Sequence, residues 1–259
     1  MANDLSKINF SVDLTGRTAL VTGAGSGIGY GVAGVLRDAG ARVLVNDILP
    51  ERAKQAARDL EGEPFPGDIT RPEFIEQVRE RQIDILVNNA GFQHVSPLES
   101  FAPEVFRRLL EVMLVGPFLL CRAVVPGMRA RGFGRIINIA SVHAKIASAY
   151  KAGYVSAKHG LLGLTRVVAL ETATDGITVN AICPGYVDTP LVRNQLKDLA
   201  ASHNLPEEQV LEQVILRPVP QKRLLTPEEI GYLALFLCSD AASSITAQGY
   251  TIDGGWSQI

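Results

Sequence analysis

Apolar stretches of strand length alternate with helical stretches from residue 17 almost to the end of the chain. The strand-like stretches are continuous in Val, Ile and Leu, which is typical of strands covered on both faces. They lie at residues 18–24, 42–47, 84–91, 134–141, 176–185 and 250–255. The helical stretches between them lie at 27–39, 50–60, 72–81, 103–130, 151–174 and 226–240. This order predicts an α/β fold in which helices cover both faces of a parallel sheet.

The sequence shows no internal repeat, low-complexity segment or linker, so residues 1–259 are expected to form a single domain. Its last helix is clearly marked, because Thr226 suits the N-cap and Pro227 the first turn. Residues 190–222 differ, since a polar helical stretch leaves a predicted strand end and interrupts the alternation. Open parallel sheets bind ligands at the carboxyl ends of their strands, so we expect this segment to be a small helical lid. The alternative is a helical pair that only decorates the surface.

Composition narrows the class of partner. The chain has 259 residues, of which 47% are hydrophobic and 20% charged, and a formal net charge of -2. Such a chain buries a substantial core, and its balanced charge favours a small neutral or weakly charged partner over nucleic acid or an anionic membrane. We expect no membrane span, because the apolar stretch 109–125 carries Glu111, Arg122 and a Gly-Pro break, and no secretion signal at the amino terminus. A cytoplasmic location is the resulting expectation.

Three cysteines, Cys121, Cys183 and Cys238, lie far apart in apolar surroundings. Their odd number and their spacing favour buried thiols over a disulfide, a metal site or a nucleophile. We therefore expect no bound metal.

A glycine-rich turn joins the first predicted strand to the first predicted helix and contains Gly23, Gly27 and Gly29. Glycines there allow a tight turn and a close approach of the backbone to a pyrophosphate, which the free N–H groups of the helix would bind. The second predicted strand ends at Asp47, where a carboxylate can accept both ribose hydroxyls of a dinucleotide. The pattern predicts a Rossmann-type, doubly wound sheet. NAD is expected rather than NADP, because a 2'-phosphate would meet like charge and no Arg stands beside Asp47; the alternative is a helix-capping aspartate.

Two further strand ends carry residues that suit a cofactor. Asp68 and Ile69 lie where a third strand would end, beside the expected adenine, and Asn89 belongs to the "NNAG" that ends the fourth strand. Each is ordinary turn chemistry when taken alone. Their order along the chain favours contacts with the cofactor.

Tyr154 and Lys158 are spaced four apart in a predicted helix, so both side chains lie on one face. A phenol loses its proton near pH 10, and an adjacent ammonium favours the phenolate. Such a pair can move a proton near neutral pH. An isolated pair at this spacing is more often an ordinary surface Tyr and Lys, so its meaning depends on the other motifs.

Those motifs occur together in one order: "TGAGSGIG" at 22–29, "NNAG" at 88–91, Ser141 after "INIA", the Tyr–Lys pair, and "PGYVDT" at 184–189. Over nearly its whole length the chain resembles the short-chain dehydrogenase/reductase family. The resemblance implies that Tyr154 is the acid/base of a hydride transfer to or from a nicotinamide. It also implies that Lys158 holds the ribose and, together with the positive charge of NAD, keeps the pKa of Tyr154 low. Ser141 is implied to donate a hydrogen bond to the substrate oxygen.

The resemblance assigns the remaining cofactor contacts and the division of the chain. A cofactor half spans about residues 15–140, and a catalytic and substrate half spans about 141–259. The implied cofactor-binding residues are Gly23, Ser26, Gly27, Ile28, Gly29, Asp47, Asp68, Ile69, Asn89, Tyr154, Lys158, Val187 and Thr189. A homotetramer paired through helices 103–130 and 151–174 is also implied.

One family feature is absent from the sequence. Many members carry an Asn that supports a water-mediated proton path to the active-site lysine, and the matching position here is Met113. A thioether cannot replace the hydrogen bonds of an amide. We therefore expect an altered proton relay rather than loss of activity.

Within the family, stretches such as "GFQHVSPLESF", "GRIINIASVHAKIAS" and "YKAGYVSAKHGLLGLT" resemble the branch that interconverts D-3-hydroxybutyrate and acetoacetate with NAD. This likeness implies the following substrate-binding residues: Gln93, Ser141, His143, Lys151, Tyr154, Tyr186 and Gln195. Amides, a cation and an imidazole from separate segments would converge on one carboxylate. Individually, each polar residue could equally be a loop amide, a buried histidine, a solvated cation or part of an exposed helix.

Tyr186 stands where this branch commonly has Trp, so the pocket could be larger or more polar. Three alternatives therefore stay open beside the hydroxybutyrate reaction. The substrate could be another hydroxy acid or a hydroxy ketone, or it could be a 3-oxoacyl thioester. A non-catalytic dinucleotide-binding sensor is the remaining alternative.

Overall fold

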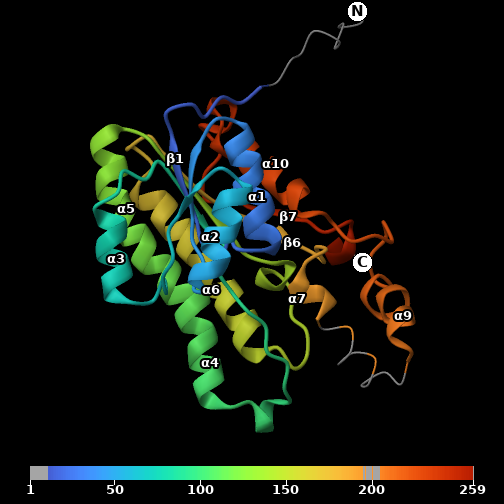
Figure 1. Ribbon diagram of the computed structural model, residues 1–259. Helices are drawn as coiled ribbons and strands as arrows, with labels where there is room; N and C mark the ends of the chain where they lie inside the picture. Colours follow the sequence, from blue (N-terminus) through green and yellow to red (C-terminus); the bar gives the residue numbers. More distant parts are fainter. Residues whose placement is uncertain (1–10, 195, 197–199, 201–204, 259) are drawn as a thin grey trace, which may run out of the picture.

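A computed structural model describes residues 11–194, 196, 200 and 205–258 (Figure 1). Its centre is a parallel sheet of seven strands in the order β3-β2-β1-β4-β5-β6-β7. The strands are β1 Thr18–Val21, β2 Arg42–Val45, β3 Glu63–Pro64, β4 Ile85–Asn88, β5 Gly134–Ile139, β6 Ile177–Pro184 and β7 Gly249–Ile252. The doubly wound sheet predicted from the sequence is confirmed. The strand order reverses between β1 and β4, so a crevice is expected at their carboxyl ends.

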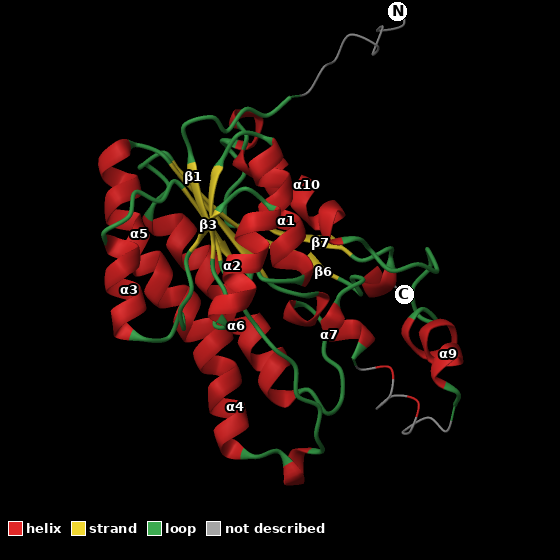
Figure 2. Cartoon of the chain, in the orientation of Figure 1, coloured by secondary structure: helices red, strands yellow, loops and turns green. Residues whose placement is uncertain are grey.

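Helices form a layer on each face of the sheet (Figures 1 and 2). The helices are α1 Gly27–Asp38, α2 Pro50–Asp59, α3 Pro72–Arg79, α4 Pro103–Leu110, α5 Gly116–Arg131, α6 Ala152–Glu171, α7 Pro190–Arg193, α9 Glu207–Val210 and α10 Pro227–Cys238. One face packs against α1, α2 and α10, and the other packs against α3, α5 and α6. The central strands are buried from both sides, which explains their continuous apolar character.

Close packing of α1 on α10 depends on two glycines. A Cβ added at Gly31 would lie 2.4 Å from the Cβ of Pro227, and one added at Gly231 would lie 2.8 Å from the Val35 side chain. The start of α10 is fixed by a capping box: the Thr226 side chain accepts a hydrogen bond from the Glu229 N–H, and Glu229 accepts one from the Thr226 N–H. A cap of this type stabilises a helix by about 1 kcal/mol. The predicted start of this helix is confirmed.

The helical stretch from Pro103 to Arg131 is continuous, because a π-helical segment, Glu111–Val115, joins α4 to α5. The Gly-Pro break expected from the sequence is absent from this described stretch: Pro117 lies in the first turn of α5, where its missing N–H is tolerated. By length and composition alone the stretch could cross a membrane. It packs instead against α3, α6 and the sheet, with Leu120 and Val124 in the core, so it is a core helix of this fold.

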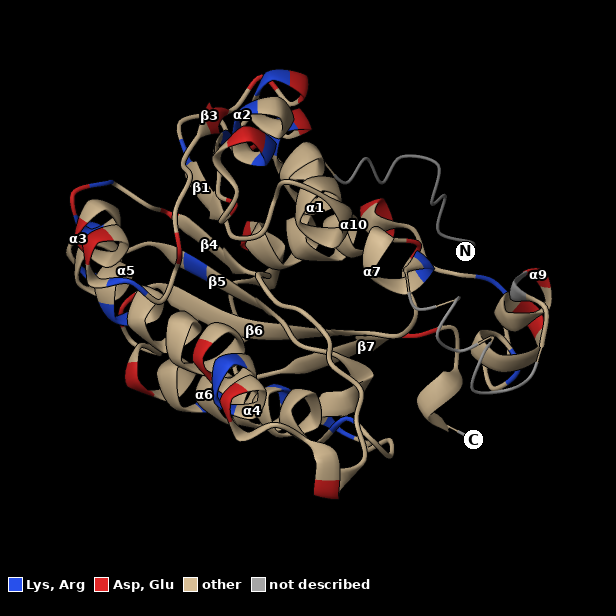
Figure 3. Ribbon diagram, turned by 60° about the horizontal axis from the view of Figure 1, so that its bottom comes forward, with Lys and Arg blue, Asp and Glu red and all other residues tan. Residues whose placement is uncertain are grey.

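The three cysteines are buried free thiols, as predicted. Lys and Arg are interspersed with Asp and Glu over the outer surfaces of α2, α3, α4 and α6 (Figure 3). This distribution agrees with the balanced charge of the sequence.

The segment 190–222 contains α7, α9 and a second π-helical segment, Leu211–Ile215. It has a small apolar cluster of its own, in which Val210, Ile215 and Val219 are buried. Tyr186 and Trp256 pack against this cluster. The described residues of the segment therefore include a cluster beside the carboxyl end of β6, where the sequence predicts a lid.

Candidate active site

A cavity of about 520 Å³ opens at the carboxyl ends of the strands. Its wall includes a residue shortly after each of the first six strands: Gly23, Asp47, Asp68, Asn89, Ala140 and Thr189. Eleven of the predicted cofactor-binding residues line it, namely Gly23, Ser26, Gly27, Ile28, Asp47, Asp68, Ile69, Asn89, Tyr154, Lys158 and Thr189. Gly29 lies behind the turn and Val187 lines an adjoining pocket. The structure thus brings the expected cofactor residues to one crevice.

The glycine-rich turn is shaped for an anion. Gly23 and Gly27 have φ values of +63° and +59°, in the left-handed region that favours glycine. A Cβ on Gly29 would lie 2.5 Å from both the Asn89 Nδ2 and the Gly23 carbonyl oxygen. Asn89 also donates to the Thr22 carbonyl at 2.9 Å, so β4 holds the turn in place. Because α1 begins at Gly27, its free N–H groups face the cavity, and this cradle fits the pyrophosphate of a dinucleotide.

Asp47 is 7% exposed and lines the cavity. It also stabilises the turn that follows β2. Its Oδ1 accepts a hydrogen bond from the Leu49 N–H at 2.9 Å, and a Cβ on Gly25 would lie 2.4 Å from its Oδ2. Arg52, on the first turn of α2, lines the same cavity next to Asp47. The sequence-based statement that no Arg stands beside Asp47 is therefore wrong. The helical turn of α2 brings this arginine back toward the strand end.

Helix α6 presents Tyr154 and Lys158 to the cavity. A buried chain of hydrogen bonds holds this helix on the sheet: Asn88 donates to Asn138 at 2.8 Å, and Asn138 donates to Thr165 at 2.8 Å. The Lys158 Nζ lies 5.6 Å from the centre of the Tyr154 ring. The spacing of four therefore places the two groups together, as the sequence predicts.

Burial dominates the electrostatics of the pair in the chain by itself. Burial raises the pKa of Tyr154 above its ordinary value, and a hydrogen bond with Ser141 only partly opposes this. Burial also lowers the pKa of Lys158 to about 8, and its Nζ donates to the Ile139 carbonyl at 2.7 Å. Removal of both groups from water outweighs their proximity. The expectation that Lys158, together with the positive charge of NAD, keeps the pKa of Tyr154 low concerns the complex with the cofactor and stays a prediction.

Ser141 and His143 form a rigid corner after β5. The Ser141 Oγ accepts from the His143 N–H at 3.1 Å and lies 3.4 Å from the His143 Nδ1. The other ring nitrogen lies 2.8 Å from the Ser148 Oγ. Burial, followed by the charges of Lys151 and His159, lowers the pKa of His143 to about 4. The imidazole is therefore neutral near pH 7 and acts as a hydrogen-bonding group.

A second pocket of about 90 Å³ adjoins the cofactor cavity at Tyr154. Six of the predicted substrate residues line it, namely Gln93, Ser141, His143, Lys151, Tyr154 and Tyr186. The seventh, Gln195, lies outside the described residues. One water-sized group occupies about 10–15 Å³ of cavity volume. A pocket of about 90 Å³ therefore holds a ligand made of about six to nine groups of that size. Its size suits a small molecule with one polar end.

Sequence reasoning missed Trp256 as a wall of this pocket. The indole stacks on the Tyr186 ring with centroids 4.7 Å apart and planes at 14°, and it meets the His143 ring edge-on at 5.6 Å. Asp253 holds the turn that carries it, accepting from the Gly255 and Ser257 N–H groups at 2.9 and 2.7 Å. The available signal was the single Trp of the chain in "GGWSQI". The tail thus returns to a pocket of its own chain.

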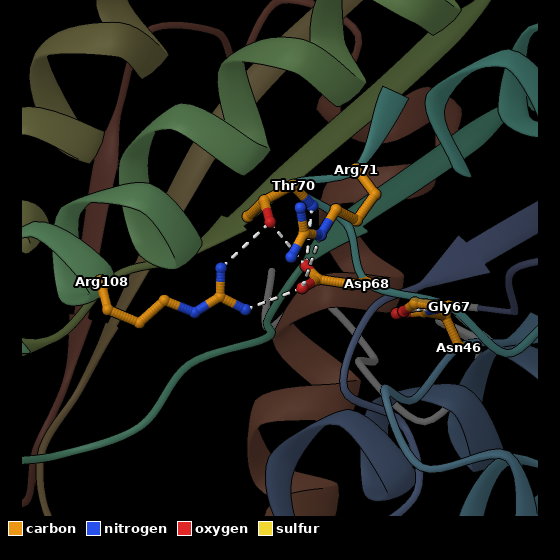
Figure 4. Close-up of polar contacts among 6 residues, drawn as sticks. All are labelled: Asn46, Gly67, Asp68, Thr70, Arg71 and Arg108. Carbon is orange, nitrogen blue, oxygen red and sulfur yellow. Dashed lines mark hydrogen bonds and ion pairs between the residues drawn. The ribbon is translucent and has the colours of Figure 1, made fainter. Parts of the chain in front are cut away.

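Arg108, on α4, is a second residue that the sequence did not single out. It lines the cofactor cavity and donates to the Asp68 carboxylate at 2.8 Å and to the Thr70 hydroxyl at 3.1 Å (Figure 4). Within the described residues, no group of three or more His, Cys, Asp or Glu side chains could hold a metal ion.

A turn shaped for a pyrophosphate, a Tyr, Lys and Ser group beside it, and a small adjoining pocket together define an oxidoreductase that uses a nicotinamide dinucleotide. A short-chain dehydrogenase family model, described as enoyl-(acyl carrier protein) reductase, matches residues 23–257. The chain belongs to the short-chain dehydrogenase/reductase family.

Its relatives differ in the reactions named for them. The uncharacterized oxidoreductase YxjF of Bacillus subtilis (strain 168) is 49% identical over 251 residues, covering 93% of this chain and 98% of that protein. The D-beta-hydroxybutyrate dehydrogenase of Rhizobium meliloti (strain 1021) is 43% identical over 253 residues, covering 93% and 98%. A crystal structure of a gluconate 5-dehydrogenase from Burkholderia cenocepacia J2315, in complex with NADP and tartrate, has a TM-score of 0.84 at 35% identity, covering 95% and 97%.

Proposed function

We propose that this enzyme interconverts D-3-hydroxybutyrate and acetoacetate with NAD in the cytoplasm. The substrate binds in the small pocket beside Tyr154. The pocket carries the proposal: about 90 Å³ accommodates a four-carbon hydroxy acid of seven non-hydrogen atoms. Gln93, His143 and Lys151 line it from three separate segments. The Gln93 Oε1 already accepts from the His94 N–H at 3.0 Å, which leaves its amide hydrogens for a carboxylate. The 43% identity to a D-beta-hydroxybutyrate dehydrogenase supports the same substrate.

The chemistry assigned to the chain is the movement of one proton at the Tyr154 oxygen. A bound nicotinamide dinucleotide would supply the hydride acceptor. The charges of Lys158 and of the bound oxidised cofactor would favour the phenolate of Tyr154. This phenolate takes the hydroxyl proton of the alcohol, and Ser141 donates a hydrogen bond to the same oxygen as charge develops on it. Lys158 holds the nicotinamide ribose, and its Nζ contact with the Ile139 carbonyl fixes its position. Because Met113 is buried and offers only a thioether, the proton leaves through backbone carbonyls and water.

Asp47 supports NAD as the cofactor, because a buried carboxylate accepts two ribose hydroxyls and repels a phosphate. Arg52 works in the other direction, since a guanidinium binds phosphate well. The carboxylate is nearer the turn and the less exposed of the two, so we assign it the deciding role.

We further propose that segment 190–222 is a lid over the substrate. Its apolar cluster contacts Tyr186 and Trp256, so movement of the segment would reshape the pocket wall. In this division, residues 15–140 bind the cofactor and 141–259 bind the substrate. A homotetramer through the two long helical stretches is proposed on the family resemblance alone.

A panel of substrates tests this function. Purified protein is assayed with NAD and NADP against D- and L-3-hydroxybutyrate, acetoin and 3-hydroxyacyl thioesters, by absorbance of the reduced cofactor. We expect turnover of D-3-hydroxybutyrate with NAD. Turnover restricted to thioesters with NADP would instead show a biosynthetic reductase, the second candidate, which Arg52 favours. Cofactor binding without turnover of any substrate would show a dinucleotide sensor.

A further inference from the structure

The guanidinium of Arg108 reaches from α4 to the loop that follows β3. Its Nη2 donates to the Asp68 Oδ2 at 2.8 Å, and its Nη1 donates to the Thr70 Oγ1 at 3.1 Å (Figure 4). Arg108 and Asp68 line the cofactor cavity, at the end that also contains Asp47, whereas Thr70 does not line it. The Arg108 side chain is 39% exposed and that of Asp68 is 17% exposed. This contact thus connects two layers of the fold at the edge of the nucleotide site.

The loop itself is already held on its other side. Asn46 donates to the Phe65 and Gly67 carbonyls at 3.0 and 3.1 Å, which fixes the backbone before Asp68 beside the end of β2 (Figure 4). The Asp68 Oδ1 accepts from the Thr70 N–H at 3.0 Å and from its hydroxyl at 2.7 Å. Arg71 is 3.9 Å from Oδ2, an ion pair without hydrogen-bond geometry. Arg108 therefore sets the orientation of the carboxylate more than the path of the backbone.

These contacts leave one defined acceptor site. A carboxylate has about four lone-pair sites, and the three hydrogen bonds from Thr70 and Arg108 occupy three of them. Burial acts to raise the pKa of Asp68, but the hydrogen bonds outweigh it and lower the pKa, so the group is ionised at neutral pH. The free site is on Oδ2, the oxygen that Arg108 holds. It can accept a hydrogen bond from an amino group and repels an oxo group.

We propose that Arg108 is a positioning residue for the adenine half of the cofactor, acting by holding Asp68 Oδ2 toward the 6-amino group of the purine. This inference rests on the proposed function, because it requires a nicotinamide adenine dinucleotide in the cavity. It predicts selection for a 6-aminopurine over a 6-oxopurine. A lysine cannot substitute for Arg108, since a single ammonium lacks the planar fork that contacts Asp68 and Thr70 together.

The test compares NAD with nicotinamide hypoxanthine dinucleotide, which carries an oxygen in place of the amino group. Dissociation constants are measured by calorimetry for the wild type, Arg108→Gln, Arg108→Lys and the control Arg107→Gln, whose residue is the exposed neighbour on α4. For both Arg108 variants we expect NAD to bind about tenfold more weakly, and the hypoxanthine cofactor to change by less than about twofold. Arg107→Gln is expected to bind both cofactors as the wild type does.

Several results would overturn the inference. Unchanged NAD binding in Arg108→Gln would show that the residue does not act on the cofactor. Equal weakening of both cofactors, with a lower melting temperature, would show that Arg108 only fastens α4 to the loop. If the wild type binds neither dinucleotide, both the proposed function and this inference are wrong. If the wild type turns over substrate but the Arg108 variants weaken both cofactors equally, only the inference is wrong.

Discussion

Asp47 and Arg52 have opposite effects on the choice between NAD and NADP, and this difference allows a quantitative prediction. Replacing Asp47 by Ser removes the carboxylate and keeps a small acceptor for the Leu49 N–H, which Asp47 now binds. The lost hydrogen bonds between ribose hydroxyls and a charged group correspond to about 1.5–3 kcal/mol, or about 10–100-fold weaker NAD binding. The same change relieves repulsion of a 2'-phosphate.

The size of that repulsion follows from burial. Two unit charges about 4 Å apart interact by about 1 kcal/mol in water and about 4 kcal/mol at the effective dielectric of a protein surface. Because Asp47 is 7% exposed, the larger value applies more closely. Together the two effects shift the preference for NAD over NADP by at least about 100-fold toward NADP.

The assay measures kcat/KM for both cofactors in Asp47→Ser, in the control Asp59→Ser on the exposed far end of α2, and in Asp47→Ser combined with Arg52→Ala. We expect the control to match the wild type and the double variant to lose the gain with NADP. A change of less than about threefold in the cofactor ratio would refute the reasoning, since Coulomb's law at any plausible dielectric predicts more.

Three other changes give separate tests. Tyr154→Phe should lower kcat by about 10²–10⁴-fold while the Kd for NAD stays within about twofold, and retained turnover would exclude Tyr154 as the acid/base. His143 has its pKa lowered to about 4 from an ordinary 6.5, so the unfolded chain binds more protons between these values and stability falls as the pH drops from 6.5 to 4. His143→Gln should flatten this dependence in melting curves; an unchanged pH slope would contradict it. Trp256→Ala should reduce discrimination between 3-hydroxybutyrate and 3-hydroxypentanoate by about tenfold in kcat/KM, whereas an unchanged ratio would show that the indole does not limit chain length.

The sequence predicted the sheet and most of the helices because the central strands are buried from both sides and helices such as α10 have local start signals. It also predicted which residues reach the crevice, since the carboxyl ends of parallel strands meet at one edge. Thr189, for example, follows β6 and lines the same cavity as Gly23.

Other features depend on contacts between distant segments and left no local signal. Arg108 reaches Asp68 across 40 positions of the chain, and Trp256 meets Tyr186 only because β7 lies beside β6. The spacing of Tyr154 and Lys158 reports their proximity but not the desolvation that raises the pKa of Tyr154 in the chain by itself. Arg52 left no local signal, because only the helical turn of α2 brings it back beside Asp47.

The stacked pair of Tyr186 and Trp256 ties the shape of the small pocket to the turn that Asp253 holds. A bulky insertion that displaces this turn should open the wall of the small pocket and leave the glycine turn unchanged. We expect such a variant to keep its affinity for dinucleotide while accepting larger alcohols.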